Sequence, residues 1–352
     1  MARDDLVRSL KLQAAACANM GSAFSSQFLT QLADDVADGG YAATLLAAFV
    51  EDSTKQLIDD AVPLRILGAF HDLSLSGAEP ALSAAYPSAG FAGDAATAWA
   101  IALEVAPRHG EQLIAFTTHE PQTNEVRRSV ALLGGFLTLA KETGLPLRSF
   151  EIAASAGLNQ FWDRYHYDLG EAGLWGDPAS PVRLDTDWTG PAPPLVPVTV
   201  AQRAACDRAP VDIREPGPRR RLTAYIWADQ PERLVRLRAA IDVALAAGVD
   251  LQRSDAAAWA KAIAAPQAGF ATVLYHSVFW TYMSEAQKAE LLAVIDGLAA
   301  QATPAAPFAW LRMEPTPETM TVMEIRLTMW PGGEERLLAR SHPHGATVEW
   351  LG

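Results

Sequence analysis

The first part of the chain has the hydrophobic pattern of a series of helices. From residue 4 to about residue 145, apolar residues recur every three to four positions, and no segment alternates as a strand would. Glycine and proline break this pattern at four places, residues 39–40, 77, 87–88 and 110. The last helix is expected to begin at the cap candidates Thr123 or Asn124 and to end before Pro146. We therefore predict an all-α N-terminal domain over residues 1–145.

The pattern changes after Pro146, where short apolar runs begin to alternate with helical segments. Runs at 148–154, 249–253 and 270–276 read as strands, and 229–247 and 284–300 read as helices that open with capping boxes at Asp229 and Ser284. Three closing strands, at 307–313, 320–329 and 346–350, follow without an intervening helix. Strands separated by helices form parallel sheets. We predict an α/β domain over residues 146–352, with a Rossmann-like sheet that ends in an antiparallel β-hairpin.

An insertion is expected inside this second domain. Residues 168–200 are rich in proline, glycine and tryptophan, with one short β-like run at 182–185. Connections within compact domains rarely reach this length without a role of their own. We therefore expect a hairpin or long loop that either covers the sheet or takes part in function.

Composition excludes several classes of partner. Lys and Arg number 28 against 41 Asp and Glu, a net charge of −13, which disfavours nucleic acids and anionic membranes. The two cysteines, Cys17 and Cys206, lie far apart and form no metal-ligand spacing, so we expect neither a disulfide framework nor a metal site. No signal peptide or membrane span is recognisable. These observations predict a cytoplasmic protein without nucleic-acid or membrane partners, and they leave its oligomeric state open.

Candidate chemistry lies in the loop after the first predicted strand, because ligands bind at the carboxyl ends of such strands. The residues Glu151, Ala153, Ser155 and Gly157 have the spacing acidic-x-small-x-small-x-Gly, and Asn159 follows. This loop resembles the acidic-x-Gly-x-Gly-x-Gly loop of S-adenosylmethionine-dependent methyltransferases. Small residues let the backbone approach a cofactor closely. Alanine and serine at two glycine positions are expected to be strained wherever φ must be positive.

The order of further acids agrees with the same resemblance. In that fold an acid at the end of the second strand meets the ribose, an acid after the third lies near the adenine, and the fourth ends at the methyl acceptor. The resemblance implies Asp207 or Asp212 for the first role, Asp255 for the second and His276 at the acceptor. A plain alternative exists for each group. Asp255 suits a helix N-cap, and His276 suits a hydrogen-bonded histidine at the end of a strand.

A dense polar cluster precedes the last helix of the first domain. We interpret this cluster, together with Trp280, as the side of the cleft that meets the substrate; its members are Gln122, Thr123, Asn124, Glu125 and Arg128. Capping of the helix is the simpler alternative. As general base we expect His276 first and Glu125 second. For Glu151, an ion pair with Arg148 or Arg164 is the alternative to a role in cofactor binding.

Five longer phrases extend the resemblance to nearly the whole chain. They lie at residues 121–126, 151–159, 225–233, 276–280 and 330–333. With them the chain resembles the uncharacterised bacterial family catalogued as domain of unknown function 2332. That family has no established reaction, so the resemblance implies membership and a shared fold rather than an activity.

We therefore expect an S-adenosylmethionine-dependent methyltransferase-like protein acting on a small molecule. Two alternatives remain. An NAD(P)-dependent oxidoreductase would use a similar sheet, but its loop has the pattern Gly-x-Gly-x-x-Gly, of which Gly157 alone is present. A non-catalytic member of the same fold, binding a ligand or a partner, would also explain the missing glycines.

Overall fold

The computed structural model describes residues 2–90, 94–316 and 319–352. Its chain forms two compact units, each built from two segments. Residues 1–123 and 214–235 form the helical unit, and residues 124–213 and 236–352 form the sheet unit. The predicted boundary at residue 145 therefore differs from the division in the structure, because the segment from residue 124 belongs with the sheet.

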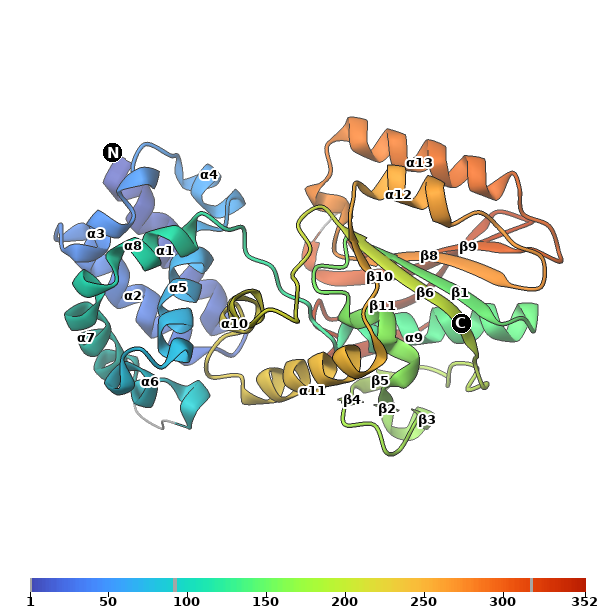
Figure 1. The fold of residues 1–352 in the computed structure, drawn as a ribbon, viewed down its shortest axis with the longest axis horizontal. Coiled ribbons are helices and arrows are strands. Elements are labelled where there is room, and N and C mark those ends of the chain that lie inside the picture. Colours follow the sequence, from blue (N-terminus) through green and yellow to red (C-terminus); the bar gives the residue numbers. More distant parts are fainter. Residues whose placement is uncertain (1, 91–93, 317–318) are drawn as a thin grey trace. The chain divides into compact units, whose positions relative to one another are not determined.

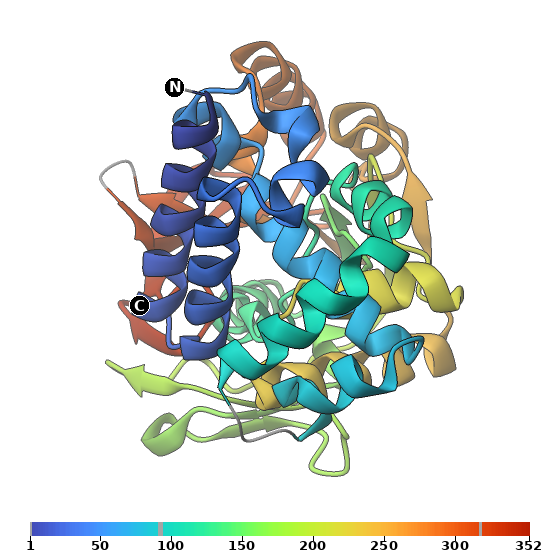
Figure 2. The same ribbon diagram turned by 90° about the vertical axis from the view of Figure 1, so that its left-hand side faces the viewer.

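The helical unit contains only helices in its described residues, as the sequence pattern predicts. Its elements are α1 (Ala2–Asn19), α2 (Ala23–Ala37), α3 (Tyr41–Leu45), η1 (Ala47–Phe49), α4 (Thr54–Asp59), α5 (Val62–Ser76), α6 (Pro80–Ala85), η2 (Pro87–Ala89), α7 (Ala95–Val105), η3 (Ala106–Arg108), α8 (Gly110–Thr117) and α10 (Pro216–Ala224). Figure 2 shows α1 and α2 in dark blue, side by side. Edge-to-face contacts of Phe28 with Phe70 and Trp99 lie in the core. None of the helices in the described ranges is both long and apolar enough to cross a membrane.

The late segment 214–235 joins this unit through several polar contacts, of which an ion pair and a capping carboxylate are the most distinctive. Arg220 of α10 forms an ion pair of 2.8 Å with Asp72 of α5. The Asp229 carboxylate accepts hydrogen bonds from the Ser22 hydroxyl and the Phe24 amide, in the first turn of α2. The sequence predicted that Asp229 caps its own helix, α11 (Pro231–Ala247), so this prediction is wrong. The carboxylate satisfies the amide of a helix more than 200 residues away instead.

A nine-stranded sheet forms the centre of the sheet unit (Figure 1). Its order is β5-β12-β11-β10-β9-β8-β1-β6-β7. The neighbours β7, β6, β1, β8 and β9 run parallel to one another, and each neighbouring pair from β9 through β10 and β11 to β12 is antiparallel. The strands are β1 (Leu147–Ile152), β5 (Asp187–Thr189), β6 (Val200–Asp207), β7 (Leu251–Arg253), β8 (Ala271–Ser277), β9 (Phe308–Thr316), β10 (Thr319–Trp330), β11 (Glu334–Ser341) and β12 (Thr347–Trp350). A mixed α/β fold with a mainly parallel sheet and a helical N-terminal region is thus confirmed.

Helices cover both faces of the sheet. Figure 1 shows α9 (Arg128–Thr143) below it, and α12 (Ala256–Ile263) and α13 (Glu285–Ala299) above it. Helix α9 approaches so closely that a Cβ atom on Gly134 would clash with the Trp350 ring, and one on Gly135 would clash with Leu311. Glycine at these two positions therefore lets α9 pack closely on the sheet.

Two details differ from the sequence prediction. Four strands close the fold rather than three, since the charged run at 334–341 forms β11, and the Gly332-Gly333 turn joins it to β10. The insertion is ordered and starts earlier, with a small sheet of β3 (Leu174–Gly176), β2 (His166–Asp168) and β4 (Arg183–Asp185), together with η4 (Leu158–Arg164) and η5 (Gly170–Ala172). Its last strand, β5, extends the main sheet beside β12.

Candidate functional site

The order of the strands creates a crevice at the carboxyl end of β1. From β1 the chain proceeds to β6 and β7 on one side, and then returns to β8 on the other side. Neighbouring connections consequently leave β1 in opposite directions, which opens a space above the strand ends. Ligands of open α/β sheets bind at such switch points.

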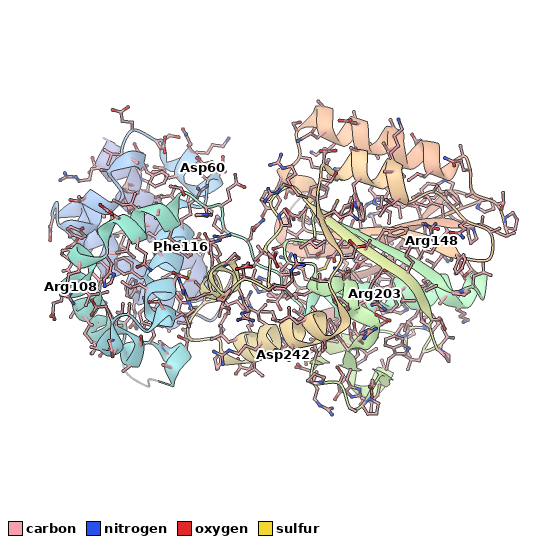
Figure 3. All side chains as sticks on the ribbon, in the orientation of Figure 1. Asp60, Arg108, Phe116, Arg148, Arg203 and Asp242 are labelled. Carbon is pink, nitrogen blue, oxygen red and sulfur yellow. The ribbon has the colours of Figure 1, made fainter. Side chains whose placement is uncertain are left out.

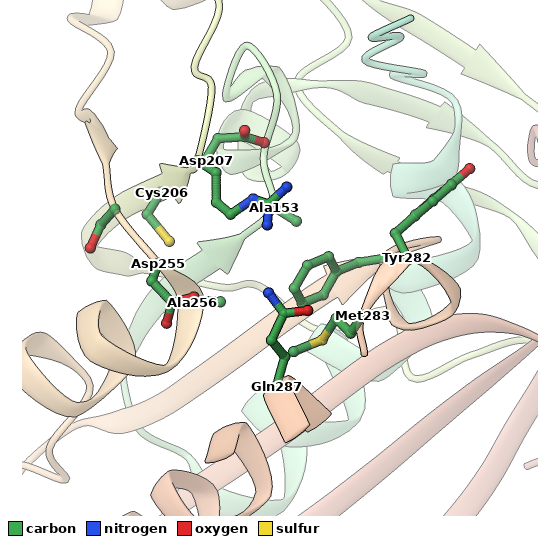
Figure 4. Close-up of a pocket in the computed structure, with 11 residues that line it drawn as sticks. Ala153, Cys206, Asp207, Asp255, Ala256, Tyr282, Met283 and Gln287 are labelled. Atoms are coloured by element: carbon green, nitrogen blue, oxygen red, sulfur yellow. The ribbon is translucent and has the colours of Figure 1, made fainter. Parts of the chain in front are cut away.

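A pocket of about 150 Å³ lies at these strand ends. Its lining comes from the end of β6, the loops after β1, β6, β7 and β8, and the first turns of α12 and α13: Ala153, Cys206, Asp207, Arg208, Ser254, Asp255, Ala256, Phe279, Tyr282, Met283 and Gln287. Figure 4 shows Asp207 and Asp255 on one side, facing Tyr282, Met283 and Gln287 on the other. Burial raises the pKa of the Cys206 thiol to about 12, so this thiol is not a nucleophile near neutral pH.

The loop after β1 has a left-handed backbone at every second position. Ala153 and Ser155 both have φ of 55°, and Gly157 has φ of 71°. Glycine adopts this conformation freely, whereas alanine or serine loses roughly 1–2 kcal/mol in it. The loop therefore has the backbone form that suits glycine at all three positions of the spacing, although two of them hold side chains.

Asp207 at the end of β6 holds this loop in place. One of its carboxylate oxygens accepts a hydrogen bond of 2.7 Å from the Ser155 amide, and the other accepts one of 2.8 Å from the Ala209 amide. Each oxygen keeps a further lone pair for a ligand. The sequence left the choice between Asp207 and Asp212 open; Asp207 lines the pocket, and Asp212 is not among the described residues that do.

Asp255 has the structural role that its position suggested and also lines the pocket. It is the N-cap of α12, where its Oδ1 atom accepts from the amides of Ala257 and Ala258. In the described part of the chain, neither Asp255 nor Asp207 forms a salt bridge. Two unpaired carboxylates on one wall favour a ligand that brings hydroxyl, amino or cationic groups.

Glu151 lies inside β1, below the loop, with 3 % of its surface exposed. Burial raises its pKa far above the usual range, and the nearby charge of Asp207 raises it further. The Glu151 Oε2 atom, the Ser155 hydroxyl and the Gln160 Oε1 atom are buried without a hydrogen-bond partner in the structure. Arg148, labelled in Figure 3, donates instead to Gln202 and to backbone oxygens, so the alternative pair of Arg148 with Glu151 does not form.

His276 is fully buried at the end of β8, and both its ring nitrogens are engaged. The Trp310 indole can only donate, and its donation to Nε2 over 3.1 Å fixes the ring proton on Nδ1. Nδ1 then donates to the Glu314 carboxylate over 2.7 Å. In this arrangement neither nitrogen can accept a proton from a substrate, so the geometry matches the hydrogen-bonded alternative rather than the expected general base.

The polar cluster divides between the two units. Asn124 does not cap α9, which begins at Arg128; its side-chain oxygen accepts from the Leu158 amide over 2.9 Å, at the start of η4. Glu125 accepts a hydrogen bond from Asn159 through its backbone oxygen, and its carboxylate accepts from the Arg127 amide. These contacts bring Asn124 and Glu125 to the loop that follows β1.

The remaining substrate candidates are not among the described residues that line the pocket. Gln122 and Thr123 belong to the helical unit. Arg128 donates to the backbone oxygen of Pro343. Trp280 stacks on His276, with 6.2 Å between ring centres, and it lies next to a pocket residue without being among those that line the pocket.

Sequence reasoning missed the wall that follows β8. Phe279, Tyr282, Met283 and Gln287 enter the pocket from this loop and the first turn of α13, and Tyr282 is 77 % exposed. The signal available in the sequence was the run of aromatic residues and methionine at 279–283 directly after the predicted strand, since such side chains favour flat apolar ligands. Of this run, only Trp280 was assigned to the substrate side of the cleft from the sequence.

The strain in the loop leads to a stability prediction. Ala153→Gly should leave the free energy of unfolding unchanged or raise it by up to about 1 kcal/mol, because relief of the left-handed strain offsets the added chain entropy. Ala154→Gly is the matched control: this buried neighbour is not among the residues with positive φ, and the change should cost about 1 kcal/mol. Urea unfolding measures both. Equal losses in the two variants would contradict a left-handed Ala153.

Comparison with known proteins identifies the family but not an activity. A family model described as an uncharacterized protein conserved in bacteria matches residues 7–350. No curated protein and no solved structure matches the chain. With nearly the full length covered by that model, the chain belongs to the bacterial family catalogued as domain of unknown function 2332.

Proposed function

We propose that this protein binds S-adenosylmethionine at the carboxyl ends of β1, β6 and β7 and transfers its methyl group to a small molecule. The observation that carries the proposal is the left-handed backbone at residues 153, 155 and 157, tied to Asp207 at the end of the second parallel strand. This backbone is what the alternating glycines of a methyltransferase-type loop would adopt without strain. Strain retained at such a loop is typical of a functional site.

The residues of the site fit this cofactor. Asp207 would accept from the ribose hydroxyls, and Asp255 would lie beside the adenine, with Phe279 and Met283 as apolar contacts. The unpartnered Ser155 hydroxyl offers one more polar contact beside the loop. A pocket of 150 Å³ is smaller than the roughly 300–1,000 Å³ of complete small-molecule sites, so the ligand would extend beyond it.

When bound, S-adenosylmethionine supplies a methyl group already activated by its sulfonium. The protein's part is then to align the acceptor, to exclude water and to stabilise positive charge. The carboxylates of Asp207 and Asp255 add negative charge to the pocket that would receive this cationic cofactor. Neither His276 nor Glu125 is among the residues that line the pocket, so the proposal includes no general base.

A nicotinamide cofactor is the main competing ligand, because an acid at the end of the second strand also suits its ribose. The two readings differ in the loop. Left-handed residues at alternate positions match the methyltransferase spacing, whereas the dinucleotide fingerprint separates its last two glycines by two residues. A non-catalytic binding protein would keep the pocket and lack the transfer.

A thermal shift assay tests the proposal. A saturating concentration of S-adenosylhomocysteine should raise the melting temperature, since a ligand at about 100 times its dissociation constant adds about 2.7 kcal/mol to stability. NADH at the same concentration should leave the melting temperature unchanged. A shift with NADH alone would favour the oxidoreductase, and a shift with neither ligand would refute both cofactor readings.

A further inference from the structure

The pocket wall that follows β8 begins at a strained residue. Val278 has φ of 52°, a conformation that branched side chains almost never adopt. The next residues turn through η6 (Trp280–Tyr282) and bring Phe279, Tyr282 and Met283 to the pocket. Because valine alone would favour another backbone conformation here, other contacts must hold the turn.

Glu314 of β9 supplies those contacts. Its Oε1 atom accepts from the Phe279 amide over 2.9 Å and from His276 Nδ1 over 2.7 Å, and its Oε2 atom accepts from the Trp280 amide over 3.1 Å. The carboxylate is largely buried, with 12 % of the side chain exposed. Three donors converge on it, two of them backbone amides next to the strained residue.

A second layer of contacts fixes this carboxylate in turn. Trp310, also on β9, donates to His276 Nε2 and thereby directs Nδ1 and its proton to Glu314. The ring of Trp280 stacks on the His276 ring. The buried histidine therefore acts on the pocket through Glu314, which explains why its two nitrogens are both engaged.

We infer that Glu314 is a positioning residue, which holds the 278–283 turn in its strained form and so presents Phe279, Tyr282 and Met283 to the ligand. The inference about ligand affinity rests on the proposed function, whereas the inference about the turn does not. Through Glu314, strand β9 supports one wall of the pocket although none of its residues is among those that line it.

Glu314→Gln tests this inference, because an amide keeps one acceptor oxygen and turns an NH2 group toward one of the three donors. Hydrogen exchange should become faster at the amides of Phe279 and Trp280, and S-adenosylhomocysteine should bind about tenfold more weakly. Glu324→Gln is the matched control. Glu324 lies directly opposite Glu314 on β10 and pairs with Arg326 rather than with the turn.

Val278→Gly in the Glu314→Gln background separates positioning from general stability. Glycine adopts positive φ without strain, so it should restore most of the lost affinity. Unchanged hydrogen exchange at the amides of residues 279–280 in Glu314→Gln would overturn the inference, as would a loss of affinity that Val278→Gly does not recover.

If the wild type does not bind S-adenosylhomocysteine, the proposed function fails, and the hydrogen-exchange rates still decide the role of Glu314. Should Glu314→Gln not fold, Glu314→Asp, which shortens the reach of both oxygens, replaces it.

Discussion

Replacement of Asp207 by alanine is expected to weaken the binding of S-adenosylhomocysteine by about 100-fold or more. The ligand would lose its hydrogen bonds to the Asp207 carboxylate. The Ser155 and Ala209 amides would lose the acceptor that fixes the loop. Two charge-assisted hydrogen bonds at about 1.5–3 kcal/mol each account for a loss of this size. Isothermal titration calorimetry measures the affinity, with circular dichroism to check that the variant is folded.

Asp212→Ala provides the control for this variant. The same alteration of charge is made five residues further along the chain, at an acid that is not among the described pocket residues. Its affinity should stay within a few-fold of the wild type. Binding by Asp207→Ala at wild-type strength would contradict the assignment of Asp207, and a large loss in Asp212→Ala would transfer the role to that residue.

Glu151→Gln is expected to gain stability over the wild type as the pH rises. Burial raises the pKa of Glu151 in the folded protein. At pH values between the ordinary pKa of about 4.3 and this raised pKa, the carboxyl is neutral in the folded chain and ionised in the unfolded chain. Unfolding then releases a proton, and the stability of the wild type falls with pH by up to about 1.4 kcal/mol per unit. Glutamine has no such proton to lose.

Urea unfolding of both proteins at several pH values between 5 and 8, without ligand, measures this difference. The free energy of unfolding of the variant minus that of the wild type should rise steadily across the series. A difference that is constant or falls with pH would show that Glu151 is not buried as a carboxylic acid beneath the loop. The comparison depends on the pH trend, so any loss of packing common to all pH values cancels.

The elements were largely predictable because their signals are local. Helical periodicity, and capping residues such as Ser284 and Asp255, specify the structure around them within a few residues, and the structure has both caps. Helix α9 was assigned to the wrong unit although its sequence contained the relevant signal. Every residue from 129 to 140 is buried, and a helix that is apolar all round packs within a layered core rather than on a surface.

The site was predictable where spacing along the chain determines it, and not where distant segments meet. The alternate small residues from 153 to 157 predicted the loop, and the order of acids predicted Asp255 and either Asp207 or Asp212; of these, Asp207 and Asp255 line the pocket. The network of His276 and Glu314 joins positions 38 residues apart on neighbouring strands. No local pattern shows that a histidine at the end of a strand already has two partners, so the sequence left both a general base and a hydrogen-bonded histidine open for His276.

The central claim, that S-adenosylmethionine binds in this pocket, is tested most directly by a crystal structure of the protein grown with S-adenosylhomocysteine. We expect the ribose hydroxyls within about 2.7–3.2 Å of the Asp207 carboxylate and the adenine beside Phe279 and Asp255. Density for the ligand at another place, or a pocket without ligand at a saturating concentration, would contradict the account.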